Sequence, residues 1–374
     1  MIGRAAPYEI VTYRPELKPE IATLQQHLWR AGETGNRAYL EWKYERNPYL
    51  PAPLVYLARH EGRVVGMRGM FGSCWEADPG SGPVVVPCAD DLVVEPAHRN
   101  RGVVGQIMRA ALADLEARGH TVAFSLSAGA ATLTSSLADG WRPVGSVREV
   151  SRISRPGSWR WRLGTRMRDW RAVWRWAEMI AHGWRRPFHH LDRPGDRESA
   201  DRAIRVTRAP RPDAMADLVR RLGHDGRARH VRDAQYLAWR FQDPQHEYRF
   251  LWAGEDRLEG YMVLCASRRA ARRGVAIVDW EGSDHSAREA LLRSAIERGR
   301  FAELSAWTLG LPPDVRALLR EAGFVPATRH RLVREGPLVL VRPLGAGRPA
   351  PWLASRALLE PASWDLRMLY SMAG

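Results

Sequence analysis

A strand-like run, a glycine-containing turn and a helix-like run follow one another between Asp91 and Gly119. The run "DLVV" is mostly apolar and β-branched and is closed by Pro96, whereas "GQIMRAALADLEARG" carries apolar residues at helical spacing until Gly119. Gly102 and Gly105 stand in the turn, where the helix begins. The pattern predicts a strand, a turn and a helix, with glycine backbone at the helix N-terminus.

The rest of the first 150 residues alternates between strand-like and helix-like patterns. Period-two runs predict strands, and apolar residues three and four positions apart predict helices. The predicted strands cover residues 8–14, 54–59, 63–76 and 121–127, and the predicted helices cover residues 15–29, 36–48 and 132–141. This alternation predicts an α/β domain built on a mixed sheet.

Three segments of this first half return, in the same order, in the second half of the chain. "YLEWKYERNP" at 39–48 corresponds to "YLAWRFQDP" at 236–244, and "EGRVVG" corresponds to "EDRLEG". "LADGWRPVG" then recurs in outline as "LREAGFVPA". Ordered echoes of this kind predict a duplicated fold, with two related domains in tandem.

The second copy lacks the basic glycine turn of the first. Where that turn would fall, the strand-to-helix segment 274–299 carries Glu281 and Asp284, whose carboxylates would repel a phosphate. We therefore expect a degenerate second half. The predicted domains are residues 1–150, a Trp/Arg-rich linker or insertion at 151–200, the degenerate domain at 201–345, and a C-terminal tail at 346–374.

Composition excludes several classes of protein. No run approaches eighteen consecutive apolar residues, and no signal peptide is present, so we expect a cytoplasmic chain without a membrane span. Cys74, Cys88 and Cys265 are far apart and lack the spacing of a metal site, so we expect reduced thiols and no bound metal.

The formal net charge of +15 is concentrated in one segment. Residues 151–186 hold ten arginines against two carboxylates, and their tryptophans follow a helical stripe. Three interpretations stay open: an inter-domain helix, a peripheral membrane contact, or a nucleic-acid contact that could reach tRNA.

The glycine turn predicts an anion site. A helix N-terminus exposes unpaired N–H groups and the positive end of the helix dipole, and glycine lets an anion approach the backbone closely. Neither the P-loop pattern nor the G-x-G-x-x-G pattern of dinucleotide folds occurs there. The sequence thus indicates a phosphate cradle of another kind.

The segment "V94-E-P-A-H-R99-N-R-G102-V-V104-G105" resembles motif A of the GNAT acyltransferase superfamily, usually [QR]-x-x-G-x-[GA]. The departure is Val104, where that family has Gly or Ala. The resemblance implies a tandem GNAT protein of bacterial type that binds acetyl-CoA or another acyl-CoA in its first half. The cofactor-binding residues it implies are Leu92, Val93, Val94, Arg99, Asn100, Arg101, Gly102, Val103, Val104 and Gly105.

The resemblance also implies the catalytic residues. In the family, a carboxylate on the strand before the turn takes the amine proton. Asp91 is best placed for this, and Glu95 and Asp90 are further candidates. The family's usual general acid is a tyrosine, but this chain has Ser136 there. A thiol with a pKa near 8.5 can leave near neutral pH without much help.

The expected function is acyl-CoA-dependent N-acylation, most simply N-acetylation, of a primary amine on a small molecule or natural-product intermediate. Two alternatives remain. One is aminoacyl-tRNA-dependent transfer through the Trp/Arg-rich segment, as in Fem-type transferases, which also have tandem GNAT-like folds. The other is a non-catalytic acyl-CoA sensor or scaffold, which the serine at 136 suggests.

Overall fold

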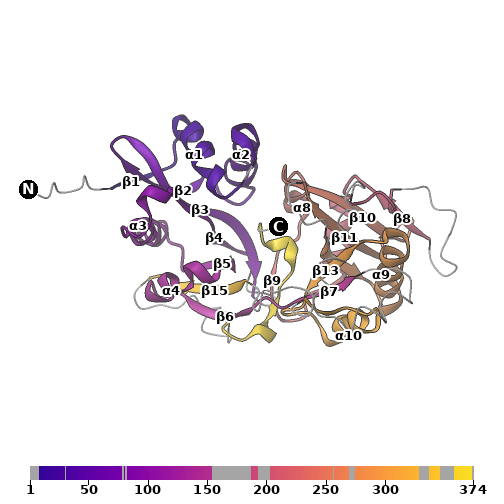
Figure 1. Ribbon diagram of the computed structural model, residues 1–374. Helices are drawn as coiled ribbons and strands as arrows, with labels where there is room; N and C mark the ends of the chain where they lie inside the picture. The colour runs from indigo at the N-terminus through magenta and orange to yellow at the C-terminus, as the bar shows by residue number, and fades with distance from the viewer. Residues whose placement is uncertain are drawn as a thin grey trace, which may run out of the picture.

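Two α/β units lie side by side in the computed structural model, each built on its own sheet (Figure 1). The structure describes residues 8–29, 31–77, 80, 82–153, 187–192, 203–255, 257–268, 274–327, 337–345 and 358–372. The mixed α/β architecture and the tandem duplication predicted from the sequence are confirmed.

The first sheet carries the predicted strand–turn–helix segment. In spatial order its main strands are β1 (Glu9–Thr12), β2 (Leu54–His60), β3 (Arg63–Glu76), β4 (Val84–Val94), β5 (Val122–Ala128), β15 (Leu338–Pro343) and β6 (Arg142–Ser146). β4 and β5 run parallel, whereas their other neighbours in the sheet are antiparallel. A parallel pair at the centre of a mixed sheet agrees with the predicted fold class.

Helices cover both faces of this sheet because the strands alternate their apolar side chains. The described helices of this half are α1 (Lys18–Leu24), α2 (Gly32–Leu40) with the π-helical turn η3 (Glu41–Glu45), α3 (Val103–Ala117) and α4 (Ala130–Ala138). Val55 and Leu57 of β2 share a core with α1 and α2, and Tyr56 and Ala58 share a core with α3. The sheet therefore fixes where α3 begins.

The second sheet repeats the order of the first. Its strands are β8 (Ile204–Thr207), β10 (His246–Ala253), β11 (Gly260–Ser267), β12 (Val275–Gly282), β13 (Glu303–Trp307), β7 (Glu149–Ile153) and β14 (Val325–Pro326). The described helices of this half are α7 (Pro212–Leu222), α8 (Ala234–Arg240), α9 (His285–Gly299) and α10 (Pro313–Glu321). The helix α9 follows β12 as α3 follows β4, so the two halves share one plan.

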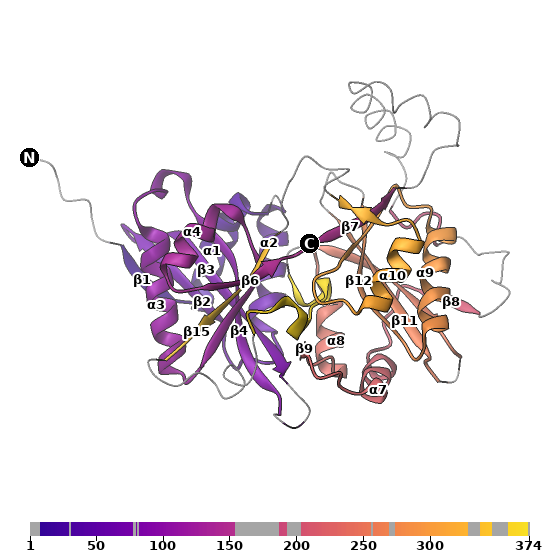
Figure 2. The same cartoon turned by 90° about the horizontal axis from the view of Figure 1, so that it is seen from below.

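Each sheet is completed by a strand from the other half of the sequence. β15 lies between β5 and β6 of the first sheet, and β7 lies between β13 and β14 of the second. Figure 2 shows the yellow-orange β15 among the violet strands and the magenta β7 beside the orange ones. Residues 149–153 therefore belong to the sheet of the second half, and residues 338–343 belong to the sheet of the first half. Neither unit is one contiguous stretch of sequence.

Trp42 and Trp239, the paired tryptophans of the repeat, join the two halves. Their rings stack with centroids 5.0 Å apart and planes 13° apart. Each indole Nε1–H donates to the other residue's carbonyl oxygen at 2.8 Å. The contact is reciprocal, as expected where two copies of one motif meet about an approximate two-fold axis.

The described part of the C-terminal tail packs between the halves. Its short strand β16 (Trp364–Asp365) pairs with β9 (Ala228–His230), which in turn pairs with β3. The tyrosine hydroxyls of the repeat donate to tail carbonyls, Tyr39 to Met372 at 3.5 Å and Tyr236 to Leu369 at 3.2 Å. The tail therefore reinforces the joint between the halves.

Within the described ranges, no helix is long and apolar enough to cross a membrane. The Trp/Arg-rich stretch at 154–186 lies outside the described residues. Its three interpretations remain predictions.

We expect Trp42→Ala to lower the free energy of unfolding by about 3–5 kcal/mol, because the fully buried indole loses its stacking partner, its hydrogen bond and its packing. Urea unfolding followed by circular dichroism measures the change. Leu137→Ala, at a side chain that is 44% exposed, is the control and should stay within about 0.5 kcal/mol of the wild type. If both substitutions changed the free energy of unfolding by the same amount, the Trp42–Trp239 contact would not stabilise the protein as described.

Candidate functional site

The turn before α3 has the backbone that its glycine predicts. Gly102 is the N-cap of α3 with φ of 72° and ψ of 10°, in the left-handed region, and Asn100 also has a positive φ of 60°. A Cβ atom at Gly102 would meet nothing within 4 Å. The corner is therefore open, and glycine is favoured there by the backbone conformation rather than by crowding.

The N-terminus of α3 is available to an anion. No side chain caps it, and the N–H groups of its first turn have no intrahelical acceptor. Arg99 and Arg101 are exposed beside it, and Arg99 also donates from Nε to the carbonyl of Val94 at 3.0 Å, which ties the turn to the end of β4. Open amides, left-handed glycine and two cations fit a diphosphate.

Val104, the departure from the expected motif, does not obstruct this corner. Its side chain packs against the core between α3 and the sheet. The same core brings α3 unusually close to β3, since a Cβ atom at Gly66 would lie 3.1 Å from both Val103 and Ile107. The close approach fixes the position of the helix N-terminus relative to the strands.

Beside the turn, β4 separates from β5. Their only registered pair within the described strands is Cys88 with Phe124, so β4 from Ala89 to Val94 pairs with β3 alone. The side of this stretch that faces β5, which includes Leu92 and Val93, therefore forms no strand ladder in the described part of the chain. Parallel strands that part beside an anion site are suited to a long ligand with a phosphate end.

Asp91 sits in a β-bulge on that stretch. Arg68 pairs with Leu92 and Gly69 pairs with Asp90, so Asp91 is the extra residue and has a φ of 49°. Its side chain is fully buried. A bulge re-aims a side chain next to a site, and here it turns the carboxylate into the interior.

Lys43 and Tyr44, which sequence reasoning did not single out, hold this carboxylate. The Tyr44 hydroxyl donates to Asp91 Oδ2 at 2.7 Å, and Lys43 Nζ lies 3.1 Å from Asp91 and 2.9 Å from Asp90. Asp91 Oδ1 has no partner among the described residues. A close approach at Gly69 makes the contact possible, because a Cβ atom there would lie 2.0 Å from the Tyr44 hydroxyl.

Burial shapes the titration of the pair. Burial raises the pKa of Asp91 above its usual value, and this outweighs the opposing effects of Lys43 and Tyr44. Burial alone would lower the pKa of Lys43, but Asp90 and Asp91 outweigh it and hold that pKa well above the usual range. The cluster therefore couples a lysine that stays charged to a carboxylate that resists ionisation.

The other two candidate catalytic residues lie away from this cluster. Glu95 is partly exposed at the end of β4, within 3.9 Å of His98 and 3.8 Å of Arg63. His98 packs under the turn, where the Tyr8 hydroxyl lies 3.0 Å from its Nδ1. Ser136 is half-buried in α4, and no contact in the described part of the chain joins its hydroxyl to Asp91.

The cysteines do not form a site in the described ranges. Cys74, Cys88 and Cys265 are free and buried, and burial raises the pKa of Cys74 to about 11 and that of Cys265 to about 12. No group of three metal-ligating side chains occurs among the described residues.

Residues 12–134 match the family model of the acetyltransferase (GNAT) domain. Residues 12–134 form a GNAT domain. The match contains the glycine turn, the bulge at Asp91 and the Lys43–Tyr44 pair, and ends before Ser136. The GNAT domain identifies the protein as an acyltransferase, and none of the curated proteins matches the chain.

Solved structures share the fold over both halves. A GCN5-related N-acetyltransferase from Anabaena variabilis ATCC 29413 has a TM-score of 0.60 and 11% identity, covering 91% of this chain and 73% of its own. The tandem GNAT protein from the clavulanic acid biosynthesis pathway has a TM-score of 0.53 and 14% identity, and the match covers 91% of this chain and 100% of that protein's chain. Eis1 from Mycobacterium abscessus has a TM-score of 0.51 and 15% identity, and the match covers 90% of this chain and 74% of that protein's chain. At these identities the likeness establishes the tandem fold alone.

We expect Lys43→Met to lower the free energy of unfolding by about 3–5 kcal/mol, because it leaves the buried carboxylate of Asp91 and the partly buried carboxylate of Asp90 without their cation. Urea unfolding measures the loss. The chain's other lysine is the matched control: Lys18 bridges Glu41 and Glu45 at a partly exposed position, so Lys18→Met should cost less than about 1 kcal/mol. A small effect at both lysines would be inconsistent with a buried ion cluster.

Proposed function

We propose that the GNAT domain binds acetyl-CoA or another short acyl-CoA and transfers the acyl group to a primary amine of a small molecule or natural-product intermediate. The observation that carries the proposal is the open, glycine-headed N-terminus of α3 directly beside the free edge of β4. The domain match supports acyl-CoA as the donor class.

The turn supplies the binding energy for the diphosphate. The N–H groups of residues 102–105 donate to its oxygens, and Arg99 and Arg101 add positive charge. The backbone of Leu92, Val93 and Val94 lines the path from this turn toward the bulge. The bound cofactor supplies an acyl thioester, and this edge of β4 orients it.

In this proposal Asp91 acts as the base. Transfer requires a neutral amine, so a group near the reacting carbonyl has to take a proton. Tyr44 and Lys43 fix Oδ2 of Asp91, which leaves Oδ1 as the atom that accepts a proton, directly or through water. A raised pKa makes this carboxylate a stronger base than an exposed aspartate.

Ser136 stands where the family usually has its acidic tyrosine, and a serine hydroxyl does not protonate a thiolate as a phenol does. A free thiol of the cysteine type has a pKa of about 8.5, so a thiol leaving group can depart as the thiolate near neutral pH and take its proton from water. The tRNA-dependent alternative rests on residues 151–186, most of which lie outside the described residues. No observation here favours it over acyl-CoA.

We expect Gly102→Glu to weaken coenzyme A binding roughly a hundredfold or more, because a carboxylate then stands beside the diphosphate. Isothermal titration calorimetry with coenzyme A measures the affinity. Gly102→Ala is the matched control, since it shares the strain at φ of 72°, which costs about 1–2 kcal/mol, without the charge. If the glutamate and alanine variants bound coenzyme A with equal affinity, the diphosphate would not bind at Gly102.

We expect Asp91→Asn to lower turnover roughly 10²–10⁴-fold with little effect on coenzyme A affinity. In the wild type, kcat/KM should rise as the pH passes the raised pKa of Asp91, because only the ionised form accepts a proton. Asp90 is the matched control. Its charge contributes to raising the pKa of Asp91, so kcat/KM of Asp90→Asn should still rise with pH, but at a lower pH than in the wild type. If kcat/KM of Asp91→Asn rose with pH as it does in the wild type, Asp91 would be excluded as the base.

A further inference from the structure

Arg68 of β3 is partly buried and has no partner in the described part of the chain. No described residue forms a hydrogen bond or an ion pair with its guanidinium group, and its Nε atom is fully buried. Burial lowers the pKa of Arg68, and the opposing effects of Asp90 and Asp91 do not outweigh it. An arginine keeps its charge at neutral pH, so a cation lies here without a bonded counterion.

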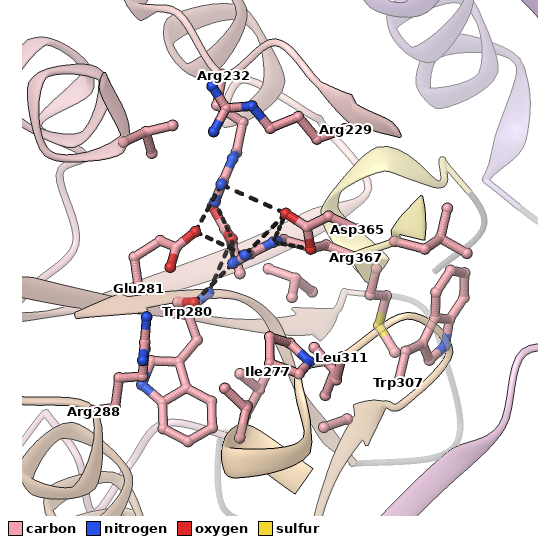
Figure 3. A pocket seen from close by; sticks show the side chains of 18 of the residues that line it. Arg229, Arg232, Ile277, Trp280, Glu281, Arg288, Trp307, Leu311, Asp365 and Arg367 are labelled. Atoms are coloured by element: carbon pink, nitrogen blue, oxygen red, sulfur yellow. Dashed lines mark hydrogen bonds and ion pairs between the residues drawn. The ribbon is translucent and has the colours of Figure 1, made fainter. Parts of the chain in front are cut away.

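The second half shows how buried arginines are usually accommodated. Its strands β12 and β13 pair only as far as Ile277–Ala306 and then separate beside a cavity of about 150 Å³. Figure 3 shows Arg232 and Arg367 in the wall of this cavity, joined by dashed lines to carboxylates. Glu281 lies 2.7 Å from each of the two guanidinium groups, and Asp365 lies 3.1 Å from that of Arg367. Buried cations of this half are therefore paired, as the cost of burying a charge requires.

Arg68 belongs to the half that carries the glycine turn. It pairs with Leu92 directly beside the bulge of β4, and the corresponding residue of β11 is Val263, which pairs with Asp279 beside the bulge of β12. The side chain of Val263 is fully buried. The second half thus has an apolar residue where the first half has an unpaired cation.

The side chain of Arg68 lies on the face of the first sheet that α3 covers. Gly66, two residues earlier in β3, faces Val103 of α3, and strand residues two apart share a face. Tyr56, the neighbour of Arg68 on β2, belongs to the core formed with α3. Arg68 and the helix that heads the proposed diphosphate site are therefore on the same side of the sheet.

The carboxylates of the neighbouring elements are bonded elsewhere. Asp114 of α3 accepts a hydrogen bond from the Tyr56 hydroxyl at 2.8 Å. The carboxylates of residues 90 and 91 lie 2.9 and 3.1 Å from Lys43 Nζ. The counterion of Arg68 is thus expected to come from a bound molecule.

Arg68 also stands beside the path proposed for the acyl-CoA. Its partner Leu92 is part of the stretch of β4 that pairs with β3 alone, between the turn at Gly102 and the bulge at Asp91. A thioester that follows this stretch brings its acyl group toward Arg68.

The charges around the bulge leave room for one anionic group. When Asp91 carries a proton, Lys43 and Arg68 face the single charge of Asp90, and one positive charge is unbalanced. A carboxylate matches the planar fork of a guanidinium group and accepts two parallel hydrogen bonds from it.

We propose that Arg68 binds a carboxylate group carried by a substrate of the acyl transfer. The proposal rests on the proposed acyl-CoA site and narrows its substrates. The carboxylate belongs either to the acyl group, as in the thioester of a short dicarboxylic acid, or to the amine acceptor, as in an amino acid. The position of Arg68 on the face of α3 favours the acyl group. Arg68 determines specificity and takes no part in proton transfer.

The first arm of the test compares two unreactive thioethers of coenzyme A by isothermal titration calorimetry on the full chain. S-(3-carboxypropyl)-CoA and S-butyl-CoA have tails of equal length and differ in the terminal carboxylate. If the carboxylate belongs to the acyl group, it should strengthen binding at least tenfold. Coenzyme A itself is the reference, since a failure of coenzyme A to bind would refute the proposed acyl-CoA site and not the role of Arg68.

The second arm compares the acceptors glycine and L-phenylalanine, each with its own amide, in the presence and absence of coenzyme A. A preference of at least tenfold for the amino acids would assign the carboxylate to the acceptor. Because this arm is also run without coenzyme A, it tests Arg68 even if the acyl-CoA site fails. Equal affinities within every pair of both arms, or no binding at all, would overturn the proposal.

Arg68→Met should abolish the preference found in either arm and leave the affinity for coenzyme A within about twofold of the wild type. The urea midpoint should stay the same or rise, because the substitution removes a buried charge that has no partner. Arg63→Met, at an arginine of the same strand that is 75% exposed, is the matched control and should change none of these quantities.

Three results would contradict this role of Arg68. They are a preference that persists in a folded Arg68→Met protein, a tenfold loss of its affinity for coenzyme A, and a lower urea midpoint with the preference retained. If Arg68→Met does not fold, Arg68→Lys keeps the charge without the fork and should reduce the preference; an undiminished preference would then be the contradicting result.

Discussion

The separation of β4 from β5 after Cys88 is the constraint on which the rest of the structure depends. Two parallel strands that stayed paired would satisfy each other's main-chain groups and leave no room for a ligand. Because they part, the edge of β4 opens beside the N-terminus of α3, and the bulge at Asp91 falls in the same place. Anion site, ligand path and carboxylate are thus brought together by one feature of the sheet.

Duplication copied this feature, and the two halves then used it differently. The first half kept a left-handed glycine ahead of α3 and buried Lys43 against two carboxylates. The second half capped α9 with Asp284 and placed the tail residue Arg367 across its gap, donating to the Trp280 carbonyl at 2.7 Å. The two halves therefore differ in the charge at the helix terminus and along one strand.

Local patterns in the sequence predicted the turn, the tandem plan and the position of Asp91, because each rests on neighbouring residues or on a repeat. The partners of Asp91 could not be found in this way, since Lys43 and Tyr44 lie 47 and more residues away and meet it through the close approach at Gly69. The sequence also does not predict that β7 and β15 each complete the sheet of the other half. "LVLVRP" predicts a strand, but nothing within it specifies which sheet it completes.

A crystal structure of the chain soaked with acetyl-CoA is the most direct test of the proposed cofactor site. We expect the two phosphates within hydrogen-bond distance of the N–H groups of residues 102–105, and the thioester carbonyl along the free edge of β4 near Asp91. A nucleotide bound to the second half, or a corner at Gly102 closed by side chains with the cofactor elsewhere, would contradict it.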